Sequence, residues 1–297
     1  MGNAGLRQTT GNQYITQDPR NYFQNDLPKF ILQAKIGNGK FMKTYIMRVD
    51  GAPVVVKIYM KLNDEDLLVP AANLTFMWKT LSPAKYPNLL PYQMWMRSSS
   101  RLKGPATPIY LIRQYINTNL YDRLSTRPFL NELEKLWIIF QLFKCVEICH
   151  ENGIVHGDLK PENIMCTTSN WVVLTDFSPF KPAFVPDDDP TDFQYYFDCM
   201  GRHRCYLAPE RFHHRTVGGT IPAAEAAGLD APTASNNFKT RFAGKLSRSN
   251  VQSSPAFQGS QLTPAMDVFA LGCIAAEVSS GTFQFVLLII FYIFFLF

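Results

Sequence analysis

The chain has 297 residues, of which 46% are hydrophobic, 18% charged and 13% aromatic, and its formal net charge is +5. A chain of this length and apolar content can bury a large core, which excludes a mainly disordered protein. The 6 cysteines form no CxxC pair and are too few for a disulfide scaffold. The net positive charge is small, and the sequence contains no long run of Lys and Arg. The charge therefore gives no reason to expect nucleic acid as a partner.

The first part of the chain is predicted to be rich in β-strands. Residues 30–56 are alternating and β-branched around a glycine-rich turn, and Asp50-Gly51 is a hairpin signal. The run VVVKIYM then predicts a buried strand, and PIYLIRQYI, starting at 108, predicts another. These segments together predict a small lobe built on a sheet.

A long helix is predicted over residues 130–152, with Gly153 placed to end it as a C-terminal cap. Cys145, Cys149 and His150 lie on this helix and could be metal ligands, but packed thiols beside a helix-end histidine are the more frequent arrangement. We therefore expect reduced thiols in a larger helical lobe. The apolar residues with helical spacing include Leu133, Leu136, Trp137, Phe140, Val146 and Ile148.

Two segments depart from this pattern. Residues 216–263 are rich in Ala, Ser, Thr, Pro and Gly without a sustained apolar period, which predicts a surface insertion or flexible loop. Residues 283–297 are apolar or aromatic except Gln284, but as a helix they would span only about 22 Å, less than a hydrocarbon core of about 30 Å. We expect this tail to be a truncated or read-through end foreign to the fold, and an integral membrane anchor is the alternative.

The residues suited to chemistry are concentrated after the long helix, in HGDLKPEN and LTDF. Asp158, Lys160 and Asn163 share one tight loop, where they can orient a substrate hydroxyl, balance the charge of a moving phosphoryl group and hold a metal. Asp176 follows a predicted strand at 171–175 and can reach the same metal and the nucleotide phosphates. The side-chain oxygens of Asn163 and Asp176 suit Mg²⁺.

Further motifs stand on either side of this loop. Lys57 lies on the VVVK strand, where it can neutralise the α and β phosphates of a nucleotide, and Gly37 and Gly39 would form the turn over it. The triplet APE at 208–210 and the run DVFALG at 267–272 follow downstream. Together these landmarks resemble, in type and order, those of eukaryotic protein kinases.

The match narrows further within that family. The stretch RQYINTNLYDRLSTRPFL, the HGD in place of the usual HRD, the loop after LTDF and the stretch RCYLAPERF resemble the regulatory subunit 4 family, the kinase-like, membrane-tethered subunits of class III phosphatidylinositol 3-kinase complexes. The resemblance covers about residues 2–281 and is dense over 110–212. It implies an α+β, two-lobed protein kinase fold. The implied parts are a leader (1–25), a β-rich N-lobe (26–116), a helical C-lobe that is incomplete at its C-terminal end (117–281) and the apolar tail (282–297).

The resemblance also implies a serine/threonine protein kinase that uses ATP and Mg²⁺. The implied roles are Asp158 as catalytic base, Lys160 as the lysine that neutralises phosphate, Asn163 and Asp176 as Mg²⁺ ligands, and Gly37, Gly39 and Lys57 as nucleotide-binding residues.

Several departures keep a second function open. Met42 stands at the third glycine of GxGxxG, Ser178 at the glycine of DFG, and no acidic residue lies between 70 and 81, where the partner of Lys57 should fall. Glu65 is the nearest candidate but lies early. The alternative is therefore a nucleotide-binding, catalytically weak pseudokinase scaffold that regulates the lipid kinase. Separately, Gly157 in place of the usual arginine implies a loop that is not switched by phosphorylation.

The amino end opens as an N-myristoylation site would, with Gly2 after Met1, although Leu6 replaces the usual Ser or Thr. The resemblance favours lipidation of Gly2, and since one myristoyl chain binds membranes only marginally, partner subunits would supply the second contact. The implied partners are the class III phosphatidylinositol 3-kinase catalytic subunit and its autophagy and endosomal regulatory subunits. The implied location is cytoplasmic and peripheral on endosomal, autophagic and Golgi membranes, with roles in autophagy, endosomal trafficking and vacuolar or lysosomal protein sorting.

Overall fold

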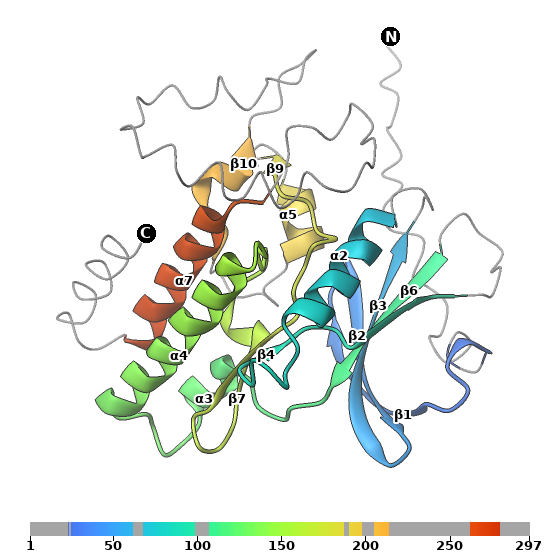
Figure 1. Ribbon diagram of the computed structural model, residues 1–297, viewed down its shortest axis with the longest axis horizontal. Coiled ribbons are helices and arrows are strands. Elements are labelled where there is room, and N and C mark those ends of the chain that lie inside the picture. The colour runs from blue at the N-terminus through green and yellow to red at the C-terminus, as the bar shows by residue number, and fades with distance from the viewer. Residues whose placement is uncertain are drawn as a thin grey trace, which may run out of the picture. The chain divides into compact units, whose positions relative to one another are not determined.

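The computed structural model describes residue 23 and residues 25–61, 68–98, 107–186, 190–197, 205–213 and 262–279. The contacts within the chain divide it into two units, Met1–Asn117 and Thr118–Phe297. The first unit carries a five-stranded sheet and one helix, and the second carries most of the helices (Figure 1).

The sheet of the first unit is antiparallel, with strand order β1-β2-β3-β6-β5. It confirms the strands predicted from residue 30 onward and from residue 108. Helix α2 and the short strand β4 complete the unit. The bounds are β1 (Ile31–Asn38), β2 (Met42–Val49), β3 (Ala52–Lys61), α2 (Leu68–Thr80), β4 (Leu89–Leu90), β5 (Met94–Arg97) and β6 (Thr107–Gln114).

The hairpin between β2 and β3 turns at Asp50 and Gly51, as the sequence predicts. Asp50 has φ 48° and Gly51 has φ 80°. Positive φ at both central positions defines a type I′ turn, whose twist matches that of the paired strands. The register runs from Val49 opposite Ala52 to Met42 opposite Tyr59 without a shift, so this turn fixes the position of every β3 residue relative to β2.

Buried side chains from β2, β3 and β6 form a core in the first unit. Phe23 packs edge-to-face on Tyr45, with ring centroids 5.1 Å apart, and is itself buried although the sequence places it in the leader. The hydroxyl of Tyr110 donates a 2.7 Å hydrogen bond to Asp26, which holds the start of the described chain against β6. The buried residues of this cluster are Phe23, Leu27, Tyr45, Met47, Val54, Val56, Ile58, Tyr110 and Ile112.

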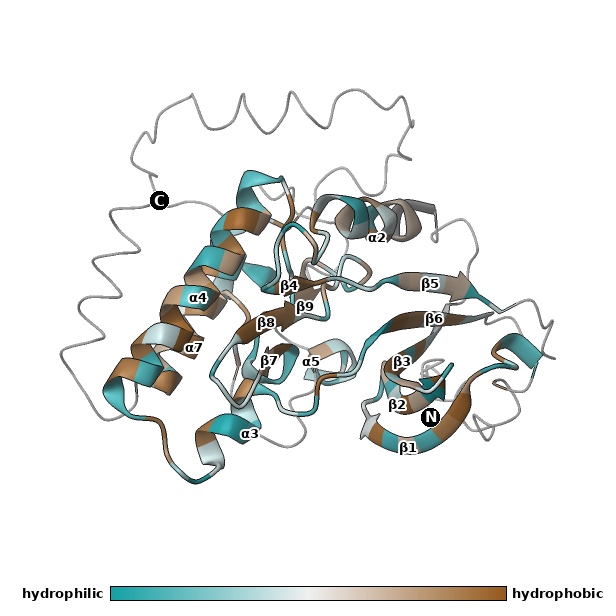
Figure 2. Ribbon diagram, turned by 60° about the horizontal axis from the view of Figure 1, so that its bottom comes forward, coloured by the Kyte–Doolittle hydropathy of each residue, from teal (hydrophilic) through white to brown (hydrophobic). Residues whose placement is uncertain are grey.

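The second unit is built around helix α4, which lies beside α7 and packs on β8 (Figure 1). Strands β7 and β8 pair antiparallel, and β9 and β10 pair parallel. Strands β7 and β8 are hydrophobic along their length (Figure 2) and all their residues are buried. The bounds are α3 (Leu120–Ser125), α4 (Glu132–Glu151), η2 (Pro161–Asn163), β7 (Ile164–Cys166), β8 (Val172–Thr175), β9 (Val185–Pro186), α5 (Pro190–Phe197), η3 (Pro209–Arg211), β10 (Phe212–His213) and α7 (Pro264–Val278).

Helix α4 matches the predicted helix and has a specific start. The side chain of Asn131 accepts from the backbone N–H of Glu134, and the Glu134 carboxylate accepts from the backbone N–H of Asn131. This capping box satisfies donors that a helix otherwise leaves unpaired. The buried face comprises Ile138, Ile139, Gln141, Leu142, Cys145, Val146, Cys149 and His150.

Helical spacing predicted the helix but not its buried face. Leu133, Leu136, Trp137 and Phe140 are all at least 38% exposed, and the rings of Trp137 and Phe140 stack with centroids 5.8 Å apart. Among the apolar residues that carried the prediction, Val146 is buried. The helix therefore has a second apolar stripe on its outer surface.

Gln141 joins α4 to the start of β8. Its amide nitrogen donates 2.9 Å to the carbonyl of Asn170, and its amide oxygen accepts 3.0 Å from the N–H of Val172. Asn170 has φ 57° and its side chain donates 2.9 Å to Glu134. The strand that leads to Asp176 is thus held at its beginning by a polar side chain from the helix.

Several predictions concern residues outside the described ones. These are the Gly2 lipidation site, nearly all of the 216–263 insertion, the tail at 283–297 and Glu65. Of the helices that the structure describes, none combines the length and apolar composition that crossing a bilayer requires.

Candidate active site

The loop between α4 and η2 is organised by the buried His156. Its Nε2 lies 2.8 Å from the carbonyl of Thr175, and its Nδ1 accepts 3.2 Å from the backbone N–H of Asp158. The ring also packs on Phe177, with centroids 4.7 Å apart. Burial lowers the pKa of His156, although Asp267 and other neighbours oppose the shift. Because Nδ1 accepts from a backbone N–H and Nε2 faces a carbonyl, the hydrogen bonds fit the neutral ring with its proton on Nε2.

Asp267 on α7 holds the same loop from behind. Its carboxylate accepts from the backbone N–H of His156 at 2.7 Å and of Gly157 at 3.0 Å, and His150 Nε2 lies 3.1 Å away. Gly157 has φ +79°, in the left-handed region that favours glycine. The backbone that leads into Asp158 is therefore fixed by a buried charge from a residue more than 100 positions away.

The carboxylate of Asp158 is buried and bound at one oxygen. Oδ2 accepts 3.0 Å from the amide of Asn163 and 2.7 Å from Lys181 Nζ, and Lys160 Nζ lies 3.8 Å away. Burial alone would raise the pKa of this carboxyl, but the positive charges of Lys160 and Lys181 prevail and lower it to about 2. Asp158 is thus an ionised carboxylate across the physiological pH range.

Asn163 and Asp176 are brought to the same edge of the β7-β8 pair. Asn163 directly precedes β7 and Asp176 directly follows β8, and the register sets Ile164 opposite Leu174. Thr175 adds a 3.0 Å hydrogen bond from its hydroxyl to the carbonyl of Asn163. Asp176 has φ 65°, a conformation that L-residues adopt only where neighbours impose it. An amide oxygen and a carboxylate at one edge are hard ligands of the kind Mg²⁺ takes.

The predicted nucleotide residues lie in the first unit: Gly37 and Lys57 are in one row across the sheet, and Gly39 is in the turn after β1. Gly37 on β1 pairs with Thr44 on β2, and Thr44 pairs with Lys57 on β3. A Cβ at Gly37 would lie 3.1 Å from the Thr44 side chain, so a larger residue there would need Thr44 to shift by a few tenths of an ångström. Lys43 Nζ donates 2.9 Å to the carbonyl of Gly39, which fixes the turn after β1.

Helix α2, where a kinase carries the acidic partner of Lys57, has the sequence LVPAANLTFMWKT without an acidic residue. Met42, at the place of the third glycine, begins β2 in extended conformation. These two departures from the kinase pattern, the missing acidic residue and Met42, therefore lie in described elements.

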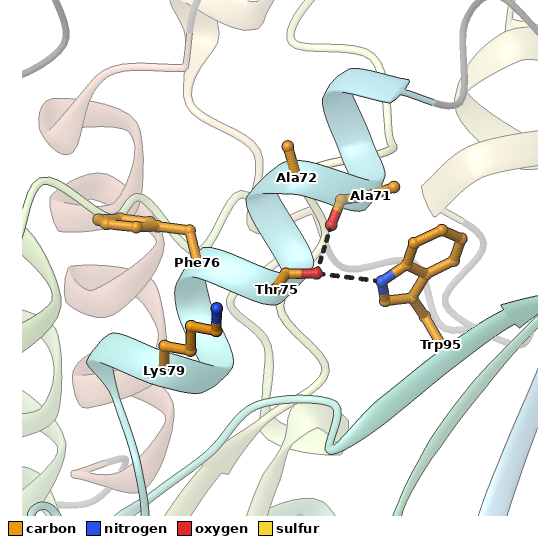
Figure 3. Close-up of a pocket in the computed structure, with 6 residues that line it drawn as sticks. All are labelled: Ala71, Ala72, Thr75, Phe76, Lys79 and Trp95. Atoms are coloured by element: carbon orange, nitrogen blue, oxygen red, sulfur yellow. Dashed lines mark hydrogen bonds between the residues drawn. The ribbon is translucent and has the colours of Figure 1, made fainter. Parts of the chain in front are cut away.

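A shallow apolar pocket lies on the surface of the first unit. Figure 3 shows Thr75 at its centre, where its hydroxyl donates 3.0 Å to the carbonyl of Ala71 and accepts 3.2 Å from the indole N–H of Trp95. The walls come from α2 and β5 and offer no charged group except Lys79. It shares no residue with the predicted site. The lining residues are Ala71, Ala72, Thr75, Phe76, Lys79 and Trp95.

Two residues that contact the catalytic loop, Lys181 and Arg211, were not predicted from the sequence. Lys181 binds Asp158 directly, and Arg211 Nη1 donates 2.8 Å to the carbonyl of Gly157. The available signal was weak: a lone basic residue between LTDF and an acidic stretch, and an arginine directly after the APE triplet.

The thiols on α4 are structural, as expected. Cys145 and Cys149 are buried and form no disulfide, and burial raises the pKa of Cys145 to about 12 and that of Cys149 well above its usual value. His150 Nε2 lies 3.1 Å from Asp267 Oδ2. Within the described part of the chain, no cluster of three or more His, Cys, Asp or Glu side chains is arranged to hold a metal ion.

Comparison with known proteins agrees with this geometry. The chain is 38% identical over 261 residues to the Arabidopsis thaliana "Serine/threonine-protein kinase VPS15" and 39% identical over 261 residues to the Dictyostelium discoideum "Probable serine/threonine-protein kinase vps15", in each case over 86% of this chain. It is 34% identical over 246 residues, 82% of this chain, to the Saccharomyces cerevisiae "Serine/threonine-protein kinase VPS15".

The chain spans only 15%, 11% and 14% of the length of these three relatives, respectively. The family model "Protein kinase domain" matches residues 30–221, which include both the β-sheet of the first unit and the loop with Asp158, Asn163 and Asp176. This chain therefore belongs to the protein kinase domain family, as its resemblance to eukaryotic protein kinases implies.

Proposed function

We propose that this chain is the kinase domain of a serine/threonine protein kinase-like regulatory subunit of a class III phosphatidylinositol 3-kinase complex, and that it transfers the γ-phosphate of ATP to protein hydroxyls. The observation that carries the proposal is the convergence of Asp158, Asn163 and Lys160 within one buried loop. The similarity to the VPS15 kinases over most of this chain supports the same choice.

The proposed reaction has a simple proton balance. The ionised Asp158 accepts the proton of a substrate serine or threonine hydroxyl, and the hydroxyl oxygen forms a bond to the γ-phosphorus as the bond to the departing ADP oxygen breaks. Lys160, whose Nζ lies 3.8 Å from Asp158 Oδ2, would neutralise charge on the transferred group. Hydrogen bonds from Asn163 and Lys181 hold the Asp158 carboxylate, and positioning supplies much of the rate of such reactions.

The donor set at the β7-β8 edge fits a bound Mg²⁺. The ion would be held by the amide oxygen of Asn163 and the carboxylate of Asp176, and it would supply charge neutralisation on the nucleotide phosphates. Asn163 directs its amide nitrogen to the carbonyl and carboxylate of Asp158, at 2.7 and 3.0 Å, which leaves its amide oxygen for a cation. Gly37, Gly39 and Lys57 are assigned to the nucleotide by the kinase motifs alone.

A second candidate function is a catalytically weak scaffold that regulates the lipid kinase. The observation in its favour is helix α2, which offers no acidic partner for Lys57, together with Met42 at the place of a glycine. In this alternative the same loop binds a nucleotide that it turns over slowly.

The proposed partners are the class III phosphatidylinositol 3-kinase catalytic subunit and its autophagy and endosomal regulatory subunits. We further propose a peripheral location on endosomal, autophagic and Golgi membranes, with myristoylation of Gly2 as one of the membrane contacts. The motif at Met1-Gly2 and the similarity to the VPS15 kinases support these assignments.

The experiment that tests the proposal measures Mg²⁺-dependent transfer of radiolabelled γ-phosphate to the chain itself and to casein. Asp158→Asn should lower transfer by roughly 10²- to 10⁴-fold. Transfer that continues unchanged in this variant would exclude the kinase reaction at this site. The scaffold alternative is supported instead if wild-type protein transfers no phosphate while both proteins still co-purify with the lipid kinase subunit.

A further inference from the structure

Lys181 forms the shortest contact of the catalytic carboxylate, although it lies outside the motifs that define the site. Its Nζ is 2.7 Å from Oδ2 of Asp158, and the two side chains are only 9% and 8% exposed. A buried ion pair of this kind is expensive to break from one side, because the remaining charge loses its partner inside the protein.

The segment that carries Lys181 is tied to the catalytic loop by its backbone. The N–H of Ser178 donates 3.0 Å to the carbonyl of His156, and the N–H of Lys181 donates 3.3 Å to the carbonyl of Ser178. The hydroxyl of Ser178 donates 3.0 Å to the carbonyl of Asp176. Ser178 therefore begins a turn that brings Lys181 back toward Asp158, which lies 23 positions earlier in the chain.

Arg211 holds the same segment from the other side. Its guanidinium donates to the carbonyls of Pro182 at 2.9 Å, Ala183 at 2.8 Å and Gly157 at 2.8 Å. The first two residues directly follow Lys181, and the third directly precedes Asp158. The Arg211 side chain is buried, so these hydrogen bonds are shielded from water. They hold the backbone next to Lys181 and the backbone next to Asp158 in a fixed position relative to each other.

Phe197 completes this arrangement. Lys181 Nζ lies 4.9 Å and Arg211 Cζ 4.8 Å from the centroid of its ring, which is itself buried at the end of α5. Both cations gain from the electron-rich face of the ring.

We propose that Lys181 is a positioning residue of the phosphotransfer reaction: its ammonium holds Oδ2 of Asp158, so that Oδ1 is the oxygen presented to the substrate hydroxyl, and Arg211 holds the segment that carries Lys181. Within the described residues, the hydrogen bonds to this carboxylate all reach Oδ2. The proposal rests on the proposed function and adds to it a residue and a mode of positioning.

The opposite role, in which the lysine blocks Asp158, makes a different prediction. A lysine that occupied the substrate position would inhibit transfer, and its removal would raise the rate. A lysine that orients the carboxylate supports transfer, and its removal lowers kcat because the carboxylate is free to rotate.

The split between kcat and KM separates positioning from mere structural support. A carboxylate that is free to rotate slows the chemical step, so kcat falls while KM for Mg-ATP and casein changes little. Partial rescue by Lys181→Arg, which restores a positive charge at this position, distinguishes the charge from the bulk of the side chain.

The test compares wild type, Lys181→Met, Lys181→Arg and Lys144→Met in the complete chain, with Mg-ATP and casein as substrates. Lys144 is a matched control because it pairs with Glu147 on the exposed surface of α4. We expect Lys181→Met to lower kcat by about 10- to 100-fold with little change in KM, Lys181→Arg to regain part of the loss, and Lys144→Met to match wild type.

The outcomes are distinguishable. An unchanged or increased kcat in Lys181→Met overturns the positioning role while leaving the kinase reaction in place. If wild type itself transfers no phosphate, the proposed function fails first and the positioning role fails with it. A double-mutant cycle of Lys181→Met with Asp158→Asn in urea unfolding then shows whether the ion pair exists without the reaction, and circular dichroism verifies that each variant folds.

Discussion

The carboxylate of Asp267 accepts a 2.7 Å hydrogen bond from the backbone N–H of His156. This bond joins the first turn of α7 to the loop that carries the catalytic aspartate. The same carboxylate accepts the next N–H, from Gly157, at 3.0 Å. Two consecutive backbone donors of a buried loop are thus satisfied by a single charged group, and no other secondary structure pairs them.

Replacing this group should therefore destabilise the second unit. Asp267→Asn keeps the shape but cannot accept both backbone donors with equal strength, and we expect a loss of about 2–4 kcal/mol in the free energy of unfolding. Urea unfolding followed by circular dichroism measures the loss. Glu147→Gln, at an exposed pair on α4, should change the same quantity by less than about 1 kcal/mol. Equal effects from the two substitutions would contradict the role given to Asp267.

A second prediction concerns Gly157, where HGD replaces HRD. Its φ of +79° costs a non-glycine residue about 1–2 kcal/mol, and a Cβ there would lie 2.7 Å from Leu262 Cδ1. Gly157→Ala should lower the free energy of unfolding by about that amount. Leu262→Ala in the same chain should relieve the contact with the new methyl group but not the cost of the backbone conformation. Full rescue by the second substitution would show that backbone strain contributes nothing.

The third prediction tests the connection between α4 and β8. Gln141→Leu retains the buried volume but leaves the N–H of Val172 and the carbonyl of Asn170 without their partner, so we expect a loss of about 1–3 kcal/mol in unfolding free energy. Hydrogen exchange at Val172 should become faster in this variant. Protection that remains at the wild-type level would mean that the strand start is held by other contacts.

The fourth prediction follows from the lowered pKa of Asp158. The folded pKa of about 2 lies below the ordinary aspartate value of 3.8, so this carboxyl contributes stability above pH 3.8 that is lost as pH falls toward 2. Linkage gives about 1 kcal/mol of that loss between pH 5 and pH 3. Urea unfolding at these two pH values should show a steeper decline for wild type than for Asp158→Asn, and parallel declines would contradict it.

The local motifs were predictable because each depends on a short stretch of chain. The Asp50-Gly51 turn, the strand before Asp176 and the capped helix from Glu132 are set by turn chemistry, apolar runs and helical spacing, and all three appear where expected. The loop with Asp158 and Asn163 is likewise recognisable from spacing alone.

The partners of that loop were not predictable in the same way. Lys181, Arg211 and Asp267 reach it from 23, 54 and 111 positions away, respectively, and no periodicity relates such distances to a contact. Their roles depend on how the turn at Ser178 and the start of α7 are placed in three dimensions. The spacing of apolar residues also does not indicate which apolar stripe of α4 is buried, because both stripes have helical spacing.

The two buried thiols of α4 can report by their chemical modification when this helix separates from α7 and β8. Cys145 and Cys149 are 1% exposed and their pKa values are raised by burial, so reagents that need a thiolate cannot modify them while the helix stays packed. The exposed Cys205 reacts without any such opening. Mass spectrometry can follow the rate at which Cys145 and Cys149 become modified. This rate reports how often the second unit opens under native conditions, and no label has to be introduced.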